Sequence, residues 1–245
     1  MSRTYDLDVS GAKGVPNPLP PINGQDGPPL GPSGNGADGQ GDFCVCVKSA
    51  GPGLPGNAGQ AAPGAANGQN GRDALTINLT CTEFVGPGLT LLNLGGDGAY
   101  GDDAGRGGHG GAGGNAGKQP HGCKQLINGG IGGNAGDGGN AGSGGHGGNA
   151  AFVSIVYGAG FTATPLSSYS SGGKGGDAGK YGAPGNPGQG GADSDHKPAD
   201  SGAKGQYGQQ GEIGGSGKGG GFNAKQDDGL PGTYLRITTV SNVTV

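Results

Sequence analysis

Glycine recurs with a period of three over much of this chain, and this period constrains the fold more than any other feature. From Gly95 to Lys118 the sequence reads Gly-Gly-X almost without exception, and the same register returns from Gly129 to Ala151. Alanine is the usual replacement for glycine in both tracts, and Asp102 is the exception. Looser tracts, in which about every third residue is glycine, cover 24–42, 53–71, 172–192 and 202–220.

A period of three matches one regular backbone, the left-handed polyproline-II-type helix. Such a helix has no internal hydrogen bonds, so neighbouring helices or water must pair its N–H and C=O groups. Glycine on two of its three edges allows neighbours to approach closely, while the X side chains project from the third edge. We therefore predict a bundle or sandwich of about six polyglycine-II rods in two layers, with X side chains facing outward and no α-helix.

Composition supports this interpretation and leaves one alternative open. The 245 residues include 67 glycines and 17 prolines, and only 30% are hydrophobic, too few for a conventional apolar core. Collagen would require more proline and one unbroken Gly-X-Y register. Disorder is the alternative, because ordering glycine is costly and little apolar area offsets that cost. Against it, a flexible linker has no reason to confine other residues to one position in three.

Charge and hydropathy exclude several partners. The net charge of −4 and the lack of a basic cluster give no reason to expect nucleic acid. No apolar stretch is long enough for membrane insertion, and the first 30 residues contain no typical secretory signal. We nevertheless expect an extracellular, cell-surface or virion location.

Short segments of alternating apolar and polar residues separate the glycine tracts and predict β-strands. Each leads into or out of a tract, so we expect one module over 1–245, with the strands forming a compact sheet or end plate beside the rods. The expected strands lie around Tyr5, Leu7 and Val9, and over Asp42–Lys48, Leu75–Thr82, Gly88–Leu94, Phe152–Tyr157 and Tyr234–Val240.

The motif GGNAG at 113–117, 132–136 and 138–142, with GGDAG at 175–179, resembles the polyglycine-II sandwich of the tip adhesin of T-even-like phage long tail fibres. The pattern is also similar to springtail (snow flea) antifreeze proteins. Unlike both, this chain has strands between its tracts. The adhesin resemblance implies recognition loops at the rod ends, with counterparts at Lys118–Asn128, Gly158–Ser171 and Asp193–Asp200. The candidate binding residues are Lys118, His121, Phe161, Tyr169, His196 and Tyr207.

Known catalytic motifs are not supported. Matches to G-x-G-x-x-G lack the strand, helix and distal acidic residue of a dinucleotide site, and no Gly-Lys is followed by Ser or Thr as in a P-loop. Acidic residues are scattered at X positions rather than paired. We predict that the protein is not an enzyme and uses no cofactor.

The cysteines predict a disulfide crosslink at one end of the rods. A disulfide from Cys44 or Cys46 to Cys123 would tie loops together. The alternative is a zinc or copper site of three thiolates with His121. Cys81 lies on the apolar face of its strand and is expected to be a buried thiol. His109 and His146 occupy X positions and are expected to be solvated.

Three functions remain open. A binding module would display loops to a cell-surface protein or glycan. A fibre subunit would pair its edge strands with copies of itself, forming a homo-oligomer or filament. An ice-binding protein would need a flat face of small, weakly polar groups, which charged X residues weaken. The candidate assembly residues are Tyr5, Leu7, Val9, Tyr234, Leu235 and Ile237.

Overall fold

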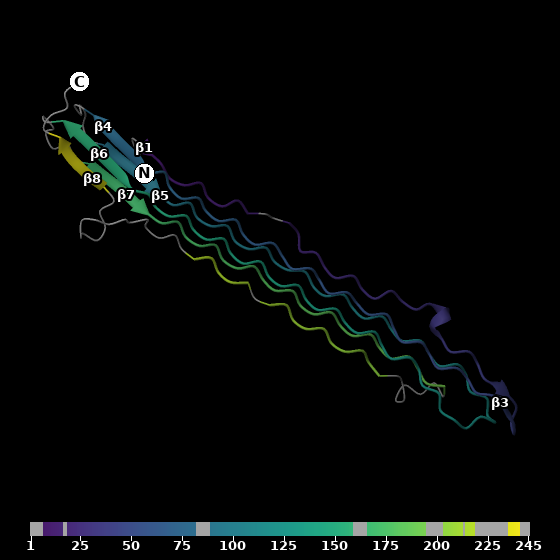
Figure 1. Cartoon of the computed structure of the whole chain (residues 1–245). Helices are drawn as coiled ribbons and strands as arrows, with labels where there is room; N and C mark the ends of the chain where they lie inside the picture. Colours follow the sequence, from purple (N-terminus) through teal and green to yellow (C-terminus); the bar gives the residue numbers. More distant parts are fainter. Residues whose placement is uncertain are drawn as a thin grey trace, which may run out of the picture.

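The computed structural model describes residues 7–16, 19–81, 89–158, 166–194, 203–212, 214–218 and 235–240. Most β-strands gather at one end, and a long bundle of extended chains runs from them to the other end (Figure 1). The described residues contain no α-helix, and their helical content is η1, a 3-10 turn at Pro32–Gly34. No described helix is long and apolar enough to cross a membrane.

Six extended segments, here called rods 1 to 6, connect the two ends. In the rods, backbone hydrogen bonds to neighbouring rods recur every third residue, as the glycine period predicts, except between Gly14 and Gly24 of rod 1. The predicted fold class is therefore confirmed. The rods span 9–39, 51–76, 95–118, 128–152, 172–193 and 203–218, with 17, 18 and 213 outside the described residues.

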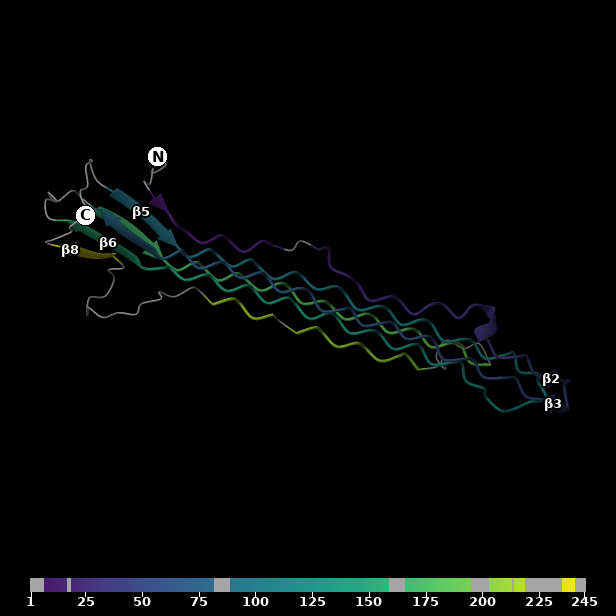
Figure 2. The ribbon, with the colours of Figure 1, turned by 45° about the horizontal axis from the view of Figure 1, so that its top comes forward.

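The rods form two layers because each pairs with the next rod and with the next but one. In rod 3, the Gly98 amide donates to the Lys174 carbonyl of rod 5 at 2.8 Å. The Gly96 amide donates to the Arg72 carbonyl of rod 2 at 2.8 Å, and its carbonyl accepts from Gly148 of rod 4 at 2.8 Å. Odd rods thus run parallel in one layer and even rods antiparallel to them in the other (Figure 2).

The strands continue these layers at one end (Figure 1). In the odd layer, β1 (Leu7–Asp8), β5 (Leu89–Leu94) and β7 (Leu166–Ser171) form a parallel sheet in the order β1-β5-β7 and lead into rods 1, 3 and 5. In the even layer, β4 (Ile77–Cys81), β6 (Val153–Gly158) and β8 (Leu235–Val240) form a parallel sheet in the order β4-β6-β8.

A small apolar core joins the two sheets. Leu91 and Val153 are buried at its centre, with Leu7, Ile77 and Leu79 packed against them. The predicted alternation within 75–82 is confirmed for 77–80, where the apolar residues are half-buried and the polar ones exposed.

One buried polar side chain adds a link between the layers. Asn93 on β5 accepts a hydrogen bond from the Ala151 amide at 3.1 Å and donates to the Ala151 carbonyl.

Two local predictions were wrong. Gly158–Ser171 was predicted as a loop, but β7 occupies Leu166–Ser171, so Tyr169 lies in a strand. The predicted half-buried strand at Asp42–Lys48 is a short hairpin of β2 (Gln40–Gly41) and β3 (Cys46–Lys48). Its apolar residues are exposed because the hairpin lies at the opposite end from the sheets and has no sheet to pack against.

Candidate functional site

The tip of the bundle is the end opposite the sheets, formed by the hairpin at 40–48 and the connection at 119–127. A disulfide joins Cys46 to Cys123, with the Cα atoms 4.7 Å apart and 77 residues between them in sequence. Cys44 is a free, exposed cysteine. The disulfide uses two of the three thiolates of the alternative metal site, and no cluster of three or more metal-ligating side chains exists among the described residues.

Hydrogen bonds hold the two halves of the tip together. The Gly122 amide donates to the Asp42 carbonyl at 3.0 Å. The Gln119 carboxamide accepts from the Ala50 amide at 2.7 Å and donates to the Gln125 carbonyl at 2.7 Å. These bonds and the disulfide fix the connection against the hairpin.

The tip exposes apolar side chains on this fixed backbone. Phe43 is 81% exposed, Val47 73% and Val45 56%. The Phe43 ring lies 5.1 Å from the ring of His121, one of the predicted binding residues. Lys118 ends rod 3 directly before the connection, and its amide donates to the Asp38 carboxylate at 2.8 Å.

The other predicted binding residues do not join this group. Tyr169 lies on β7 in the sheets, and Tyr207 is 71% exposed on rod 6 rather than in a loop. Of the predicted loop Asp193–Asp200, Asp193 and Ser194 are buried, and Asp193 accepts a hydrogen bond from the Gly129 amide at 2.8 Å. Phe161 and His196 lie outside the described residues.

The predicted assembly residues lie on sheet edges. Leu7 belongs to β1, which is an edge strand of its sheet. Val9 directly follows β1, and its amide donates to the Leu92 carbonyl of β5. Leu235 and Ile237 belong to β8, an edge strand of the other sheet. Tyr5 and Tyr234 are outside the described residues.

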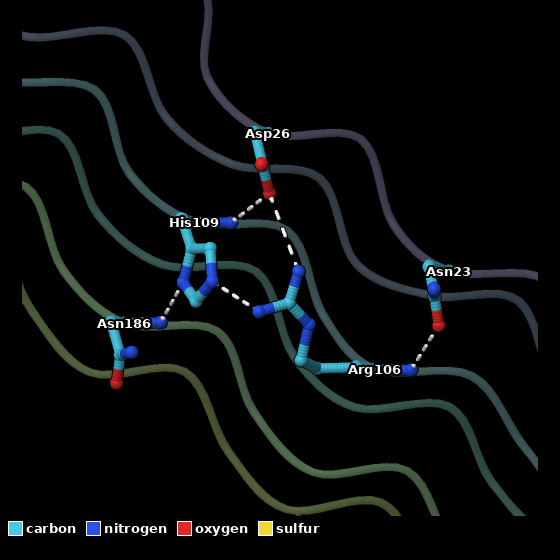
Figure 3. A network of polar contacts seen from close by, with 5 residues as sticks. All are labelled: Asn23, Asp26, Arg106, His109 and Asn186. Atoms are coloured by element: carbon cyan, nitrogen blue, oxygen red, sulfur yellow. Dashed lines mark hydrogen bonds and ion pairs between the residues drawn. The ribbon is translucent and has the colours of Figure 1, made fainter.

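Side chains at the X positions form ladders between rods of one layer (Figure 3). The Arg106 amide donates to the Asn23 side chain at 2.9 Å, and the His109 amide to the Asp26 carboxylate at 2.7 Å. The His109 ring in turn accepts through Nδ1 from the Asn186 amide at 2.8 Å. In each rung, a side chain at X accepts from the backbone N–H of an X residue on the next rod of the layer, an N–H that no glycine-to-rod bond uses.

Both rod histidines lie at the surface, His146 exposed and His109 half-buried, and both also take part in the ladders, which was not predicted. His146 accepts through Nδ1 from the Lys218 amide at 2.9 Å. His109 Nε2 also contacts the Arg106 guanidinium, which lies 3.9 Å from the Asp26 carboxylate.

Constant sequence separations show that the ladders keep their register. Partners on rods 2 and 4 are 76 residues apart in every described rung, those on rods 3 and 5 are 77 apart, and those on rods 4 and 6 are 72 apart. Between rods 1 and 3 the separation changes from 83 to 80, a difference of one turn, across η1. Recurrent Asn, Asp and His at X was the signal in the sequence.

The outer face of the even rods, here called the even face, and that of the odd rods, here called the odd face, differ in charge. Even rods carry few charged X residues, whereas odd rods carry many of both signs. On the even face they are Asp73, Asp137, Glu212 and Lys218; on the odd face they are Lys13, Asp26, Asp38, Asp97, Asp103, Arg106, Lys118, Lys174, Asp177 and Lys180.

Hydrogen bonding perturbs two carboxylates near the sheets. The Lys174 amide and the Lys13 ammonium, 2.9 Å from Asp97, lower the pKa of that carboxyl below 3.8. Hydrogen bonds from Ser10 lower the pKa of Asp8 in the same direction.

No protein-family model and no curated protein matches this chain. Among solved structures, the chain is similar to the springtail antifreeze protein of Granisotoma rainieri, a bundle of nine polyproline type II helices whose crystal waters match the ice lattice. The identity is 25%, over 69% of this chain and 95% of that one, with a TM-score of 0.12. Because the backbones superpose so poorly, this likeness carries no argument about fold or function.

Proposed function

We propose that the protein is a non-enzymatic binding module in which the bundle is a rigid spacer that presents the tip to a cell-surface protein or glycan. The observation that carries this proposal is the exposure of Phe43, Val45 and Val47 on a backbone fixed by the Cys46–Cys123 disulfide. Apolar side chains gathered at one exposed site are typical of interaction surfaces. The location we propose is extracellular, cell-surface or virion, where such a disulfide persists.

The test measures binding of the fluorescently labelled chain to glycan arrays and to intact cells. We expect Phe43→Ser to reduce binding at least about tenfold, because it removes the largest apolar contact of the tip. Leu75→Ser is the matched control, since Leu75 is 69% exposed just before β4, far from the tip. Equal binding by both variants would contradict the tip as the binding site.

A second candidate is a fibre subunit, favoured by the open edges of both sheets. A second copy, related to the first by translation, could place its β1 beside β7 and its β4 beside β8, with both strand pairs parallel. The second copy would then offer the same free edges again, so the assembly would extend instead of closing into a ring. Sedimentation velocity over a concentration series distinguishes the candidates: regular growth supports the fibre, and a compact monomer at every concentration contradicts it.

A third candidate is ice binding, favoured by the sparse charge of the even face and by its constant register. Inhibition of ice recrystallisation would support it. In that assay Asn140→Lys on the even face should abolish the effect, and Asn186→Lys on the odd face should not.

A further inference from the structure

The hydrogen bonds between rod 1 and rod 3 are interrupted for two turns of rod 1. Its Gly14 amide donates to the Asp97 carbonyl at 2.7 Å, and bonding resumes from the Gly24 amide to the Arg106 carbonyl at 2.8 Å. No described residue between these two glycines donates to rod 3. Pro20 and Pro21 have no N–H to donate. Figure 2 shows rod 1 standing away from the other rods between these two bonded stretches.

A groove of about 490 Å³ occupies this separation. Rod 1 contributes Leu19, Pro20 and Pro21 to its walls. Rod 3 contributes Tyr100, Asp102 and Asp103, and rod 5 contributes Lys180, whose amide donates to the Asp103 carboxylate at 2.7 Å. The groove lies away from the tip and belongs to no part of the site described above.

Asp102 occupies a position that is glycine or alanine elsewhere on rod 3. At the equivalent Gly105, an added Cβ would collide with the Ile22 carbonyl oxygen of rod 1. At Gly96 it would collide with the Ala12 carbonyl oxygen. A carboxylate fits at 102 because rod 1 stands away there.

The Asp102 carboxylate is buried and incompletely paired. The residue is 8% exposed, and its Oδ2 atom has no hydrogen-bond partner. Ion pairs on this face join Lys13 to Asp97 and Arg106 to Asp26, and none among the described residues involves Asp102. A buried carboxylate oxygen without a partner is unfavourable, so a ligand that supplies a cation or donor gains from binding it.

We propose that this groove binds an organic cation that carries an apolar stem. The ammonium or guanidinium group would pair with Asp102 and lie against the Tyr100 ring, where a cation–π contact adds attraction. The stem would lie along Leu19, Pro20 and Pro21, as the aliphatic part of a basic side chain does. Either a free alkylamine or a basic side chain of a partner protein has this chemistry.

The first experiment titrates the full isotope-labelled chain with n-hexylammonium and follows the amide signals of Gly101, Asp102 and Gly179 by NMR. Hexan-1-ol and hexanoate are the matched neutral and anionic probes. We expect saturable shifts with hexylammonium alone. Absent shifts, or equal shifts with hexan-1-ol, would overturn the proposal.

Variants then test the carboxylate. Asp102→Asn should weaken binding at least about tenfold, because the neutral amide loses the charge-assisted bond. Its melting temperature should not fall, since the change removes an unpaired buried charge. The matched control is Asp26→Asn, which keeps an acceptor for the His109 amide and should bind normally. Wild-type affinity in Asp102→Asn would overturn the proposal, and Tyr100→Ala offers an independent loss of several-fold.

A last arm distinguishes the two sources of the cation. A terminally blocked lysine peptide is titrated under the same conditions. Binding of the peptide would support a partner's side chain, and binding of hexylammonium alone would support a small amine. Binding of neither would overturn the proposal.

Discussion

Rods 3 and 4 differ in sequence from the rods around them because they differ in surroundings. Rod 3 exchanges hydrogen bonds with rods 1, 2, 4 and 5, and rod 4 with rods 2, 3, 5 and 6. Rod 1 is bonded to rods 2 and 3, and rod 6 to rods 4 and 5. The Gly-Gly-X pattern belongs to rods 3 and 4, which have no proline, whereas rods 1, 2 and 5 contain proline. The glycine pattern thus reports how many sides of a rod are occupied.

The same comparison explains where the bundle ends. Rod 3 donates to rod 5 from Ala104, Gly107 and Gly110. The corresponding residues of rod 5 are Tyr181, Pro184 and Pro187. The two prolines have no N–H and the tyrosine is bulky, so a further rod cannot dock there in the same way.

The largest effect should come from adding a methyl group inside the bundle. In Gly133→Ala, the Cβ would collide with the Asn57 carbonyl oxygen of rod 2. Because backbone rather than a mobile side chain is in the way, we expect a loss of about 3 kcal/mol or more, measured by urea unfolding.

Gly64→Ala is the matched control, since Gly64 occupies an outward-facing X position of rod 2 and its Cβ would lie 3.9 Å from the nearest atom, the Asn140 carbonyl oxygen. It should stabilise the protein by about 0.4–1 kcal/mol, because alanine restricts the unfolded chain. Equal losses in both variants would contradict the distinction between glycines that face a neighbouring rod and those at X.

The disulfide should have the next largest effect, because it ties the connection of outer rods 1 and 2 to that of inner rods 3 and 4. Cys123→Ser should destabilise the fold by about 2–4 kcal/mol, since the unfolded chain loses a long-range crosslink. Thermal unfolding measures the change. Cys44→Ser, which removes the free thiol, should melt as the wild type does; if it melts equally low, another pairing exists in solution.

Removing one ladder hydrogen bond should destabilise the fold less than Gly133→Ala or Cys123→Ser does. Asn140 on rod 4 accepts from the Glu212 amide of rod 6 at 2.8 Å, so Asn140→Ala should cost about 0.5–1.5 kcal/mol and speed hydrogen exchange at Glu212. Asn186 lies on rod 5, beyond which the described residues form no further rod of its layer that could donate to its carboxamide. Asn186→Ala should change stability by less than about 0.5 kcal/mol. The ladder would be unimportant if the two variants unfolded alike.

The smallest effect concerns pH. The pKa of Asp97 is lowered in the folded state, so its contribution to stability is present above 3.8 and is lost as pH falls through the folded-state value. Urea unfolding above and below 3.8 measures this loss. Asp97→Asn retains an acceptor for the Lys174 amide but cannot titrate, so it should lose less stability on acidification. An unchanged pH dependence in this variant would show that other carboxylates dominate.

Much of the fold follows from residues that act locally. The period of three predicted the rods, and the short segments predicted as strands at 75–82, 88–94 and 152–157 contain the observed strands Ile77–Cys81 and Leu89–Leu94 and most of Val153–Gly158. The strand at Leu166–Ser171 was missed because its serines are poor strand formers, and pairing with β5 decides its conformation.

The candidate sites were less predictable. His121 and Lys118 were assigned to the tip, but Phe43 and Val45 were predicted to be half-buried, because alternation cannot reveal that a strand lacks a sheet to cover it. Asp102 was visible as the departure from the glycine pattern, yet its meaning depends on rod 1 standing away from rod 3.

The sequence by itself determined the three-residue helical conformation of the rods. Glycine at fixed positions lets neighbouring rods approach closely, and the side chains at X can project only from the third edge of each rod. Tertiary structure alone decided which rods are inner and outer, which cysteine pairs with Cys123, and which X side chain accepts from which amide. Each of these depends on contacts between residues far apart in sequence, such as 72 and 83 positions, and no short-range pattern specifies which rods become neighbours.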